Sequence, residues 1–221
     1  MTRYPSFPYI APFAVFVGFL ALHSVAPMPE FADQLVRLIV LTAVLVFFAR
    51  PALDLRVTSL FASIGIGIAV FAIWIAPDLL SPAYRHSWLF ENAITGTARS
   101  SLSDASRTKV AVLVMRSLRA IAIVPIVEEL FWRAWLMRWL IAPDFQKVPL
   151  GAYAAMSFWG VAVLFASEHG AYWDVGLAAG IVYNWWMLRT KSVGDLILAH
   201  AVTNGCLCAY VIATGKWEYW L

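Results

Sequence analysis

Long runs of apolar residues, separated by short polar connections, dominate this chain. A helix needs about 20 mostly apolar residues to cross the hydrocarbon core of a bilayer. None of the runs shows the alternation of apolar and polar positions that is typical of transmembrane barrel strands. The pattern therefore predicts spanning helices. The predicted spans are residues 8–27, 34–50, 57–76, 126–142, 150–168, 172–190 and 193–214.

An eighth apolar stretch, residues 109–124, carries Lys109, Arg116 and Arg119 at helical spacing on one face. Such a segment can lie in the membrane interface, extend its basic side chains toward the headgroups, or continue into the next span as one long bent helix. Pro125 stands at the junction and is a natural kink. We therefore predict an all-α fold: a polytopic membrane helix bundle with seven or eight transmembrane helices.

Composition agrees with this fold class. Hydrophobic residues make up 62% of the 221 positions and charged residues only 13%, whereas soluble domains contain about 25% charged residues. A soluble domain of this size could not bury so much apolar surface, so a bilayer is the natural solvent. We treat residues 1–221 as a single membrane domain, in which residues 77–108 form one long polar connecting loop.

The formal net charge of +3 does not indicate a nucleic-acid partner, because the chain contains no run of five or six basic residues. In membrane proteins, Lys and Arg gather in cytoplasmic loops. This rule places the N-terminus inside and the C-terminus outside, although the arginines of residues 85–107 fit it poorly. The basic connections hold Arg50 and Arg56, Arg138 and Lys147, and Arg189 and Lys191.

Cys206 and Cys208 are the two cysteines of the chain. They lie two residues apart in an apolar helix and point to different faces, so we expect no disulfide between them. Two cysteines alone also fall short of a metal-site pattern. We interpret them as small apolar packing residues.

Two adjacent glutamates interrupt the apolar span 126–142. Ionisable groups inside spans are costly and suggest a functional site. Glu129 and Arg133 lie four residues apart and can pair on one helical face. Glu128 is rotated by about 100° from Glu129, so its carboxylate can face a different cavity and remain available for chemistry. The structural alternative is an ion pair at a helix end with the second glutamate solvated.

Two histidines occur in later spans. His169 follows Phe165 by four residues at the end of one span, where a histidine can equally be an interface residue or a hydrogen-bonded spacer. His200 and Asn204 lie four residues apart on one face of the last span. Such a polar pair could simply hold two helices together. The combination is more specific, because a carboxylate and a histidine can activate a water while a histidine and an asparagine stabilise an oxyanion.

These motifs resemble those of the CPBP family, which includes the CAAX prenyl endopeptidases of the Ras-converting type and the bacteriocin-processing and immunity proteins. The resemblance covers residues 109–214, about half of the chain, as a catalytic core. Chain size and the short terminal tail are similar to the bacterial CAAX-protease-related proteins associated with exosortase systems. The motifs, in order, are Glu-Glu-x-x-x-Arg at Glu128, Glu129 and Arg133, Phe-x-x-x-His at Phe165 and His169, and His-x-x-x-Asn at His200 and Asn204.

The resemblance implies a role for each of these residues. Glu128 would be the base that activates water, with His169 as its partner, and His200 and Asn204 would form the oxyanion hole. A small departure is Ala134, where many family members carry glycine. Glu129 and Arg133 would hold the site in shape.

The resemblance also implies an activity and a location. Family enzymes are regarded as glutamate-type intramembrane proteases that need no metal or other cofactor. The expected partners are membrane lipid and a membrane-associated protein or peptide, which can carry a lipid, cut near its C-terminus. The expected location is the bacterial cytoplasmic membrane, in which the chain would be a multi-pass integral protein.

Two other function classes stay open at this stage. A zinc hydrolase could use Glu128, His169 and His200 as a site of two histidines and one carboxylate, although the sequence lacks His-Glu-x-x-His. A scaffold or immunity-type protein could keep the same polar groups for helix packing alone, because fold and motif do not fix function. Metal content and a glutamate-to-glutamine variant would separate the three.

Overall fold

The computed structural model describes residues 4–26 and 28–220, and it confirms the predicted bundle of helices. Within those residues no strand forms, and the β pairing is one isolated bridge between Asn92 and Gly96. The main helices are α1 (Phe7–Val25), α2 (Glu30–Val44), α3 (Leu60–Leu80), α4 (Val110–Leu118), α5 (Val124–Glu129), α6 (Met137–Trp139), α7 (Ala155–Ser167), α8 (Trp173–Thr190) and α9 (Val193–Thr214).

Some of these helices join into longer rods. Wider π-helical turns at Arg119–Ile123 and Leu130–Leu136 connect α4, α5 and α6 into one rod of 30 residues, Val110–Trp139. This rod is the long bent helix that was one of the options for residues 109–124. A π-helical turn at Leu45–Ala49 and a 3-10 turn extend α2 to Ala52 in the same way.

Within residues 4–26 and 28–220, four rods are long and apolar enough to cross a membrane: Glu30–Ala52, Leu60–Leu80, Val110–Trp139 and Val193–Thr214. The apolar parts of α1 and α7 are shorter. At about 1.5 Å per residue, the 13 residues of α7 extend about 20 Å, less than the hydrocarbon core of roughly 30 Å. By length and composition alone, therefore, fewer helices qualify as membrane spans than the seven or eight that the sequence predicts.

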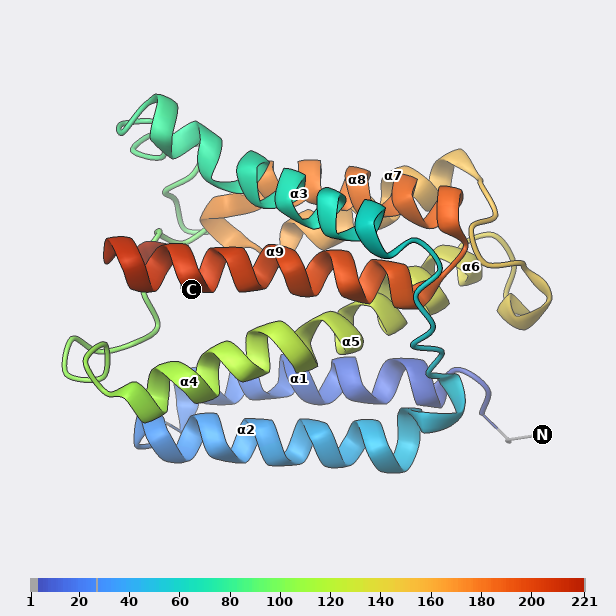
Figure 1. Cartoon of the computed structure of the whole chain (residues 1–221), viewed down its shortest axis with the longest axis horizontal. Helices are drawn as coiled ribbons and strands as arrows, with labels where there is room; N and C mark the ends of the chain where they lie inside the picture. The colour runs from blue at the N-terminus through green and yellow to red at the C-terminus, as the bar shows by residue number, and fades with distance from the viewer. Residues whose placement is uncertain (1–3, 27, 221) are drawn as a thin grey trace.

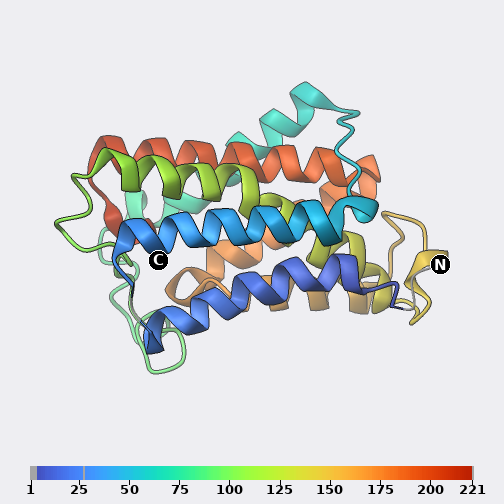
Figure 2. The ribbon, with the colours of Figure 1, turned by 90° about the horizontal axis from the view of Figure 1, so that it is seen from below.

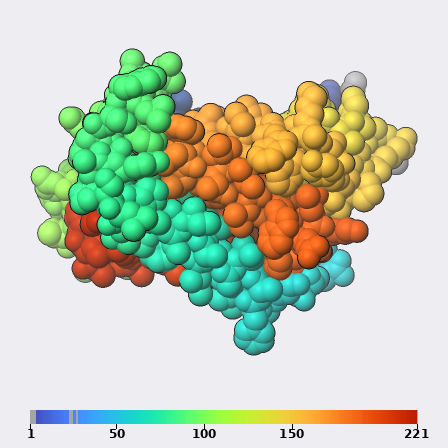
Figure 3. Space-filling view, turned by 90° about the horizontal axis from the view of Figure 1, so that it is seen from above, coloured from blue at the N-terminus to red at the C-terminus, as the bar shows by residue number. Residues whose placement is uncertain are grey.

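Large apolar side chains face outward on the rods. Phe61 is 86% exposed and Leu80 is 85% exposed, at the two ends of α3. Figure 3 shows the face on which α3 lies beside α8, with α7 on the far side of α8, and one end of this face is covered by the loop of residues 81–109. An exposed apolar surface of this kind suits contact with lipid tails.

Successive rods run back and forth along the long axis of the bundle, and the connections between them lie at its two ends (Figures 1 and 2). The α4–α6 rod and α9 lie in the middle, with α1 and α2 on one side and α3, α7 and α8 on the other. One end holds residues 50–59, 140–154 and 190–192. The other end holds residues 81–109 and the C-terminal turn.

Helix α9 packs closely against α3 because residue 67 is a glycine. A Cβ at Gly67 would lie 2.4 Å from the carbonyl oxygen of Ala199, closer than any real contact. The hydroxyl of Thr203 donates to the carbonyl oxygen of Gly67 at 2.8 Å and accepts from the Tyr183 hydroxyl at 2.7 Å. These bonds fix α9, and with it His200, against α3 and α8.

Asp195 explains how the first turns of α3 and α9 are held together. Its carboxylate is fully buried and accepts hydrogen bonds from the backbone N–H groups of Thr58 and Ser59, at 3.1 and 2.9 Å. It also accepts from the hydroxyls of Thr58 and Ser63, at 2.5 and 3.2 Å. A carboxylate is favourable at this position because the N-terminus of a helix presents unpaired N–H groups.

Arg85 binds the loop of residues 81–109 to the bundle. Its guanidinium pairs with Asp78 and Asp174, each at 2.9 Å, donates to the carbonyl oxygen of Ala171 at 2.8 Å, and lies 4.0 Å from the centre of the Tyr172 ring. Burial alone would lower the pKa of Arg85, but the hydrogen bonds and charges of Asp174 and Asp78 raise it above its ordinary value. Arg85 is therefore a structural ion-pair residue, which accounts for its poor fit to the cytoplasmic-charge rule.

Candidate active site

The two adjacent glutamates lie at a local irregularity of the long rod. One π-helical turn ends at Ile123, just before Pro125, and another begins at Leu130, just after Glu129. Proline cannot donate the backbone hydrogen bond of a regular helix, so a wider turn beside it is expected. Turns of this kind are frequent at functional sites.

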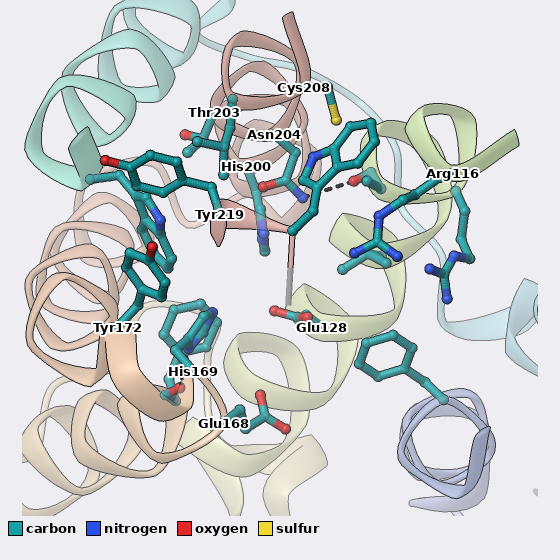
Figure 4. Close-up of a pocket in the computed structure, with 18 of the residues that line it drawn as sticks. Arg116, Glu128, Glu168, His169, Tyr172, His200, Thr203, Asn204, Cys208 and Tyr219 are labelled. Atoms are coloured by element: carbon teal, nitrogen blue, oxygen red, sulfur yellow. Dashed lines mark hydrogen bonds between the residues drawn. The ribbon is translucent and has the colours of Figure 1, made fainter. Parts of the chain in front are cut away.

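Glu128 faces a cavity of about 230 Å³. The residue is only 6% exposed, and its Oε2 atom has no hydrogen-bond partner among the residues described here. Figure 4 shows this carboxylate at the centre of the cavity. A buried carboxylate oxygen without a partner can accept a hydrogen bond from water or from a substrate.

The cavity brings together all four residues expected to be catalytic: Glu128, His169, His200 and Asn204 each line it. They come from α5, from the turn after α7, and from α9. In Figure 4, His169 lies on one side of Glu128, while His200 and Asn204 lie on another. The cavity is therefore formed by residues that lie far apart in the sequence.

His169 is held in one orientation. Its Nδ1 lies 2.8 Å from the carbonyl oxygen of Phe165, which can only accept, so Nδ1 carries the proton and Nε2 keeps its lone pair. The rings of Trp74 and Phe165 flank the imidazole at 5.1 and 4.8 Å. Residue 176 is a glycine where a Cβ would lie 3.0 Å from Nδ1 of His169. The Phe-x-x-x-His spacing thus supplies both a hydrogen-bond acceptor and a packing surface for the histidine.

Glu129 has a different environment from Glu128. It is fully buried, and its Oε1 accepts hydrogen bonds from Nη1 of Arg133 at 3.1 Å and from Nδ1 of His200 at 2.8 Å. Arg133 in turn donates from Nε to the side-chain oxygen of Asn184 at 3.1 Å, and its guanidinium lies 4.4 Å from the centre of the Phe165 ring. The ion pair expected from the sequence therefore forms, inside a network that also fixes His200.

The two residues that we expect to form the oxyanion hole, His200 and Asn204, have partners of their own. Because Nδ1 of His200 is bound to Glu129, Nε2 is the ring nitrogen left for a substrate. The amide of Asn204 donates from Nδ2 to the carbonyl oxygen of Ala120 at 2.8 Å. A primary amide carries two N–H bonds, so one remains for another acceptor.

Two residues of the site, Glu168 and Asn184, did not stand out in the sequence. Glu168 lines the cavity beside His169 and accepts a hydrogen bond from Nε1 of Trp132 at 3.2 Å. In the sequence, Glu168 could have been noticed as an acidic residue that directly precedes His169 at the end of an apolar span. Asn184 had a weaker signal, as a single amide in an apolar helix.

A zinc site would need three donors placed around one point. Within residues 4–26 and 28–220, no group of three or more His, Cys, Asp or Glu side chains is arranged to hold a metal ion. His169 and His200 each use Nδ1 for a bond within the protein, to Phe165 and Glu129 respectively, so Nε2 is the nitrogen of each ring that is left for a ligand.

Comparison with known proteins gives a match to a family model. Residues 110–206 match the family model described as type II CAAX prenyl endopeptidase Rce1-like. The matched region contains both glutamates, both histidines and Asn204. No curated protein and no solved structure matches the chain.

Proposed function

We propose that this chain, whose residues 110–206 match the Rce1-like endopeptidase model of the CPBP family, is a glutamate-type intramembrane endopeptidase that needs no metal. Its substrate would be a membrane-associated protein or peptide, in some cases lipid-modified, cut near the C-terminus. Its location would be the cytoplasmic membrane of a bacterium. The observation that supports the proposal most is the convergence of Glu128, His169, His200 and Asn204 on one cavity.

In the proposed first step, water enters between Glu128 and His169. The unpartnered Oε2 of Glu128 accepts one hydrogen of the water, and Nε2 of His169 accepts the other. The water oxygen attacks the carbonyl carbon of the scissile bond as its proton passes to Glu128. General-base assistance of this kind contributes about 10²–10⁴ in rate.

The oxyanion that forms is stabilised by the opposite wall of the cavity. The second amide hydrogen of Asn204 and Nε2 of His200 donate to it. For Nε2 to donate while Nδ1 donates to Glu129, the ring carries both protons. With Arg133 also beside Glu129, the group then has a net positive charge, which favours the oxyanion. In the last step the C–N bond breaks and Glu128 returns its proton to the leaving amine.

Substitution of Glu128 tests this mechanism. Glu128→Gln keeps size and shape but removes the base, so it should abolish cleavage of a fluorogenic farnesyl-cysteine peptide by the purified protein in proteoliposomes. Asn204→Ala should leave more activity, because loss of one oxyanion donor costs about 10²–10³ in rate. Glu91→Gln, a change of the same type in the peripheral loop, is the matched control.

Three outcomes would reject the proposal in different ways. An active Glu128→Gln together with an inactive Glu129→Gln would show that the roles of the two glutamates are reversed. Stoichiometric zinc in the purified protein, lost in His169→Ala and His200→Ala, would favour the zinc hydrolase. Processing of membrane-protein C-termini in cells can be monitored by mass spectrometry. If the double variant Glu128→Gln/His169→Ala processes them normally, the scaffold hypothesis is favoured.

A further inference from the structure

Glu168 lines the same cavity as Glu128 but has no role in the steps above. It directly follows the last residue of α7 and directly precedes His169. In Figure 4, the side chains of Glu168 and His169 lie below Glu128, whereas His200 and Asn204 lie above it. Glu168 is close enough to Glu128 for their negative charges to repel each other. The side of the cavity that holds the proposed base therefore contains a second carboxyl group.

Trp132 holds one oxygen of this carboxyl group. Its indole Nε1 donates a hydrogen bond to Oε2 of Glu168 at 3.2 Å. Trp132 is buried, so the indole is a fixed donor. It follows Glu128 by four residues along the rod, and residues at this spacing lie on one face of a helix. The rod that carries Glu128 thus also positions Glu168.

The other oxygen of Glu168, Oε1, is available to take a proton. Within residues 4–26 and 28–220, Glu168 has no ion-pair partner, and its hydrogen bond to Trp132 uses Oε2. The charge of Arg133 reaches Glu168, but this guanidinium is bound to Glu129. Glu168 is an exposed residue that also lines the cavity, so it lies where the cavity opens. A carboxyl group without a bound cation can gain and lose a proton, as acid–base catalysis requires.

We propose that Glu168 is a second acid–base residue, which carries the proton from Glu128 to the leaving nitrogen. The inference rests on the proposed function and adds a residue to its last step. Two carboxyl groups that repel each other hold a proton between them, because the negative charge of one favours protonation of the other. Transfer between the two glutamates therefore needs no further charged group.

The proton and the electron pairs are accounted for at each stage. After the attack, Glu128 holds one hydrogen of the water, and the other stays on the new hydroxyl group. Glu128 passes its proton to Oε1 of Glu168, which donates it to the nitrogen of the scissile bond. The electron pair of the oxyanion re-forms the carbonyl bond, and the C–N bond breaks with its pair on nitrogen. The amine leaves, and both glutamates are carboxylates again.

The test compares two leaving groups. Purified full-length protein in proteoliposomes would cut the fluorogenic farnesyl-cysteine peptide and the same peptide with a thioester in place of the scissile amide. A thiol has a pKa of about 8.5, so it leaves as a thiolate without a proton, whereas an amine needs one.

Glu168→Gln keeps an acceptor for the Trp132 indole but cannot carry a proton. It should lower the rate of amide cleavage about 10²-fold or more and leave thioester cleavage nearly unchanged. Glu168→Asp should retain part of the amide cleavage, because it still has a carboxyl group. Glu91→Gln, the same change in the peripheral loop, should alter neither rate.

An equal loss of amide and thioester cleavage in Glu168→Gln would overturn the inference, because a purely structural role affects both reactions. Normal amide cleavage by Glu168→Gln, with Glu128→Gln inactive, would overturn it as well and leave the proposed function in place. If Glu168→Gln does not fold, Trp132→Phe decides: it releases Glu168 and should lower amide cleavage more than thioester cleavage. No cleavage of either peptide by the wild type would reject the proposed function and the inference together.

Discussion

Two adjacent residues of the same type, Glu128 and Glu129, occupy contrasting environments. Glu128 lines the cavity, whereas Glu129 is fully buried and its Oε1 accepts hydrogen bonds from both Arg133 and His200. The environment of Glu128 suits proton transfer, and that of Glu129 suits a residue that holds the site in shape. Their neighbouring positions on the helix allow one rod to provide both.

Removal of Arg133 should destabilise the protein as well as reduce its activity. Arg133→Ala leaves Glu129 without its ion-pair partner in a fully buried position, and breaking such a pair costs about 3–5 kcal/mol. The measurement is thermal unfolding in detergent, together with the yield of folded protein. Arg189→Ala removes an exposed arginine and should change neither. Equal melting temperatures for Arg133→Ala and the wild type would show that the pair is not needed for stability.

At the level of helices, the apolar runs predicted most of the rods to within a few residues. The last helix, predicted as residues 193–214, has those limits in the structure. What local spacing could not predict were contacts between distant segments. His200 and Glu129 lie 71 positions apart, and no pattern within either helix indicates that they bond.

The position of Gly176 on α8 allows a test of how helix packing orients His169, the proposed partner of Glu128. Gly176→Ala would place a Cβ 3.0 Å from Nδ1 of His169, so the ring has to shift by a few tenths of an ångström. We expect kcat/KM to fall roughly tenfold, since small displacements of a reacting group are costly. Helix stability should not fall, because alanine is the better helix former by about 1 kcal/mol.

The matched control for this change is Gly65→Ala on α3, where no atom lies within 4 Å of the added Cβ. It should leave kcat/KM unchanged. An unaltered rate in Gly176→Ala, measured on folded protein, would mean that the orientation of His169 is not critical.

At the level of the whole molecule, the rods alternate in direction and the basic connections gather at one end. Reporter fusions after Arg56, Lys147 and Lys191 should therefore report the cytoplasm, and a fusion after Asp174 should report the far side. These positions lie at opposite ends of the bundle (Figure 1). A cytoplasmic signal after Asp174 would overturn the orientation predicted from the basic loops.

The position of the cavity has a consequence for how a hydrolase in a bilayer obtains water. Each turnover consumes one water molecule, and the surrounding lipid supplies none. The cavity is lined by Arg116, Tyr219 and Trp220, which belong to the end of the bundle that carries the loop of residues 81–109. Hydration of Glu128 would then be replenished from that aqueous side, so the rate of the enzyme would depend on how readily this end opens, even when the chemistry at the glutamate is fast.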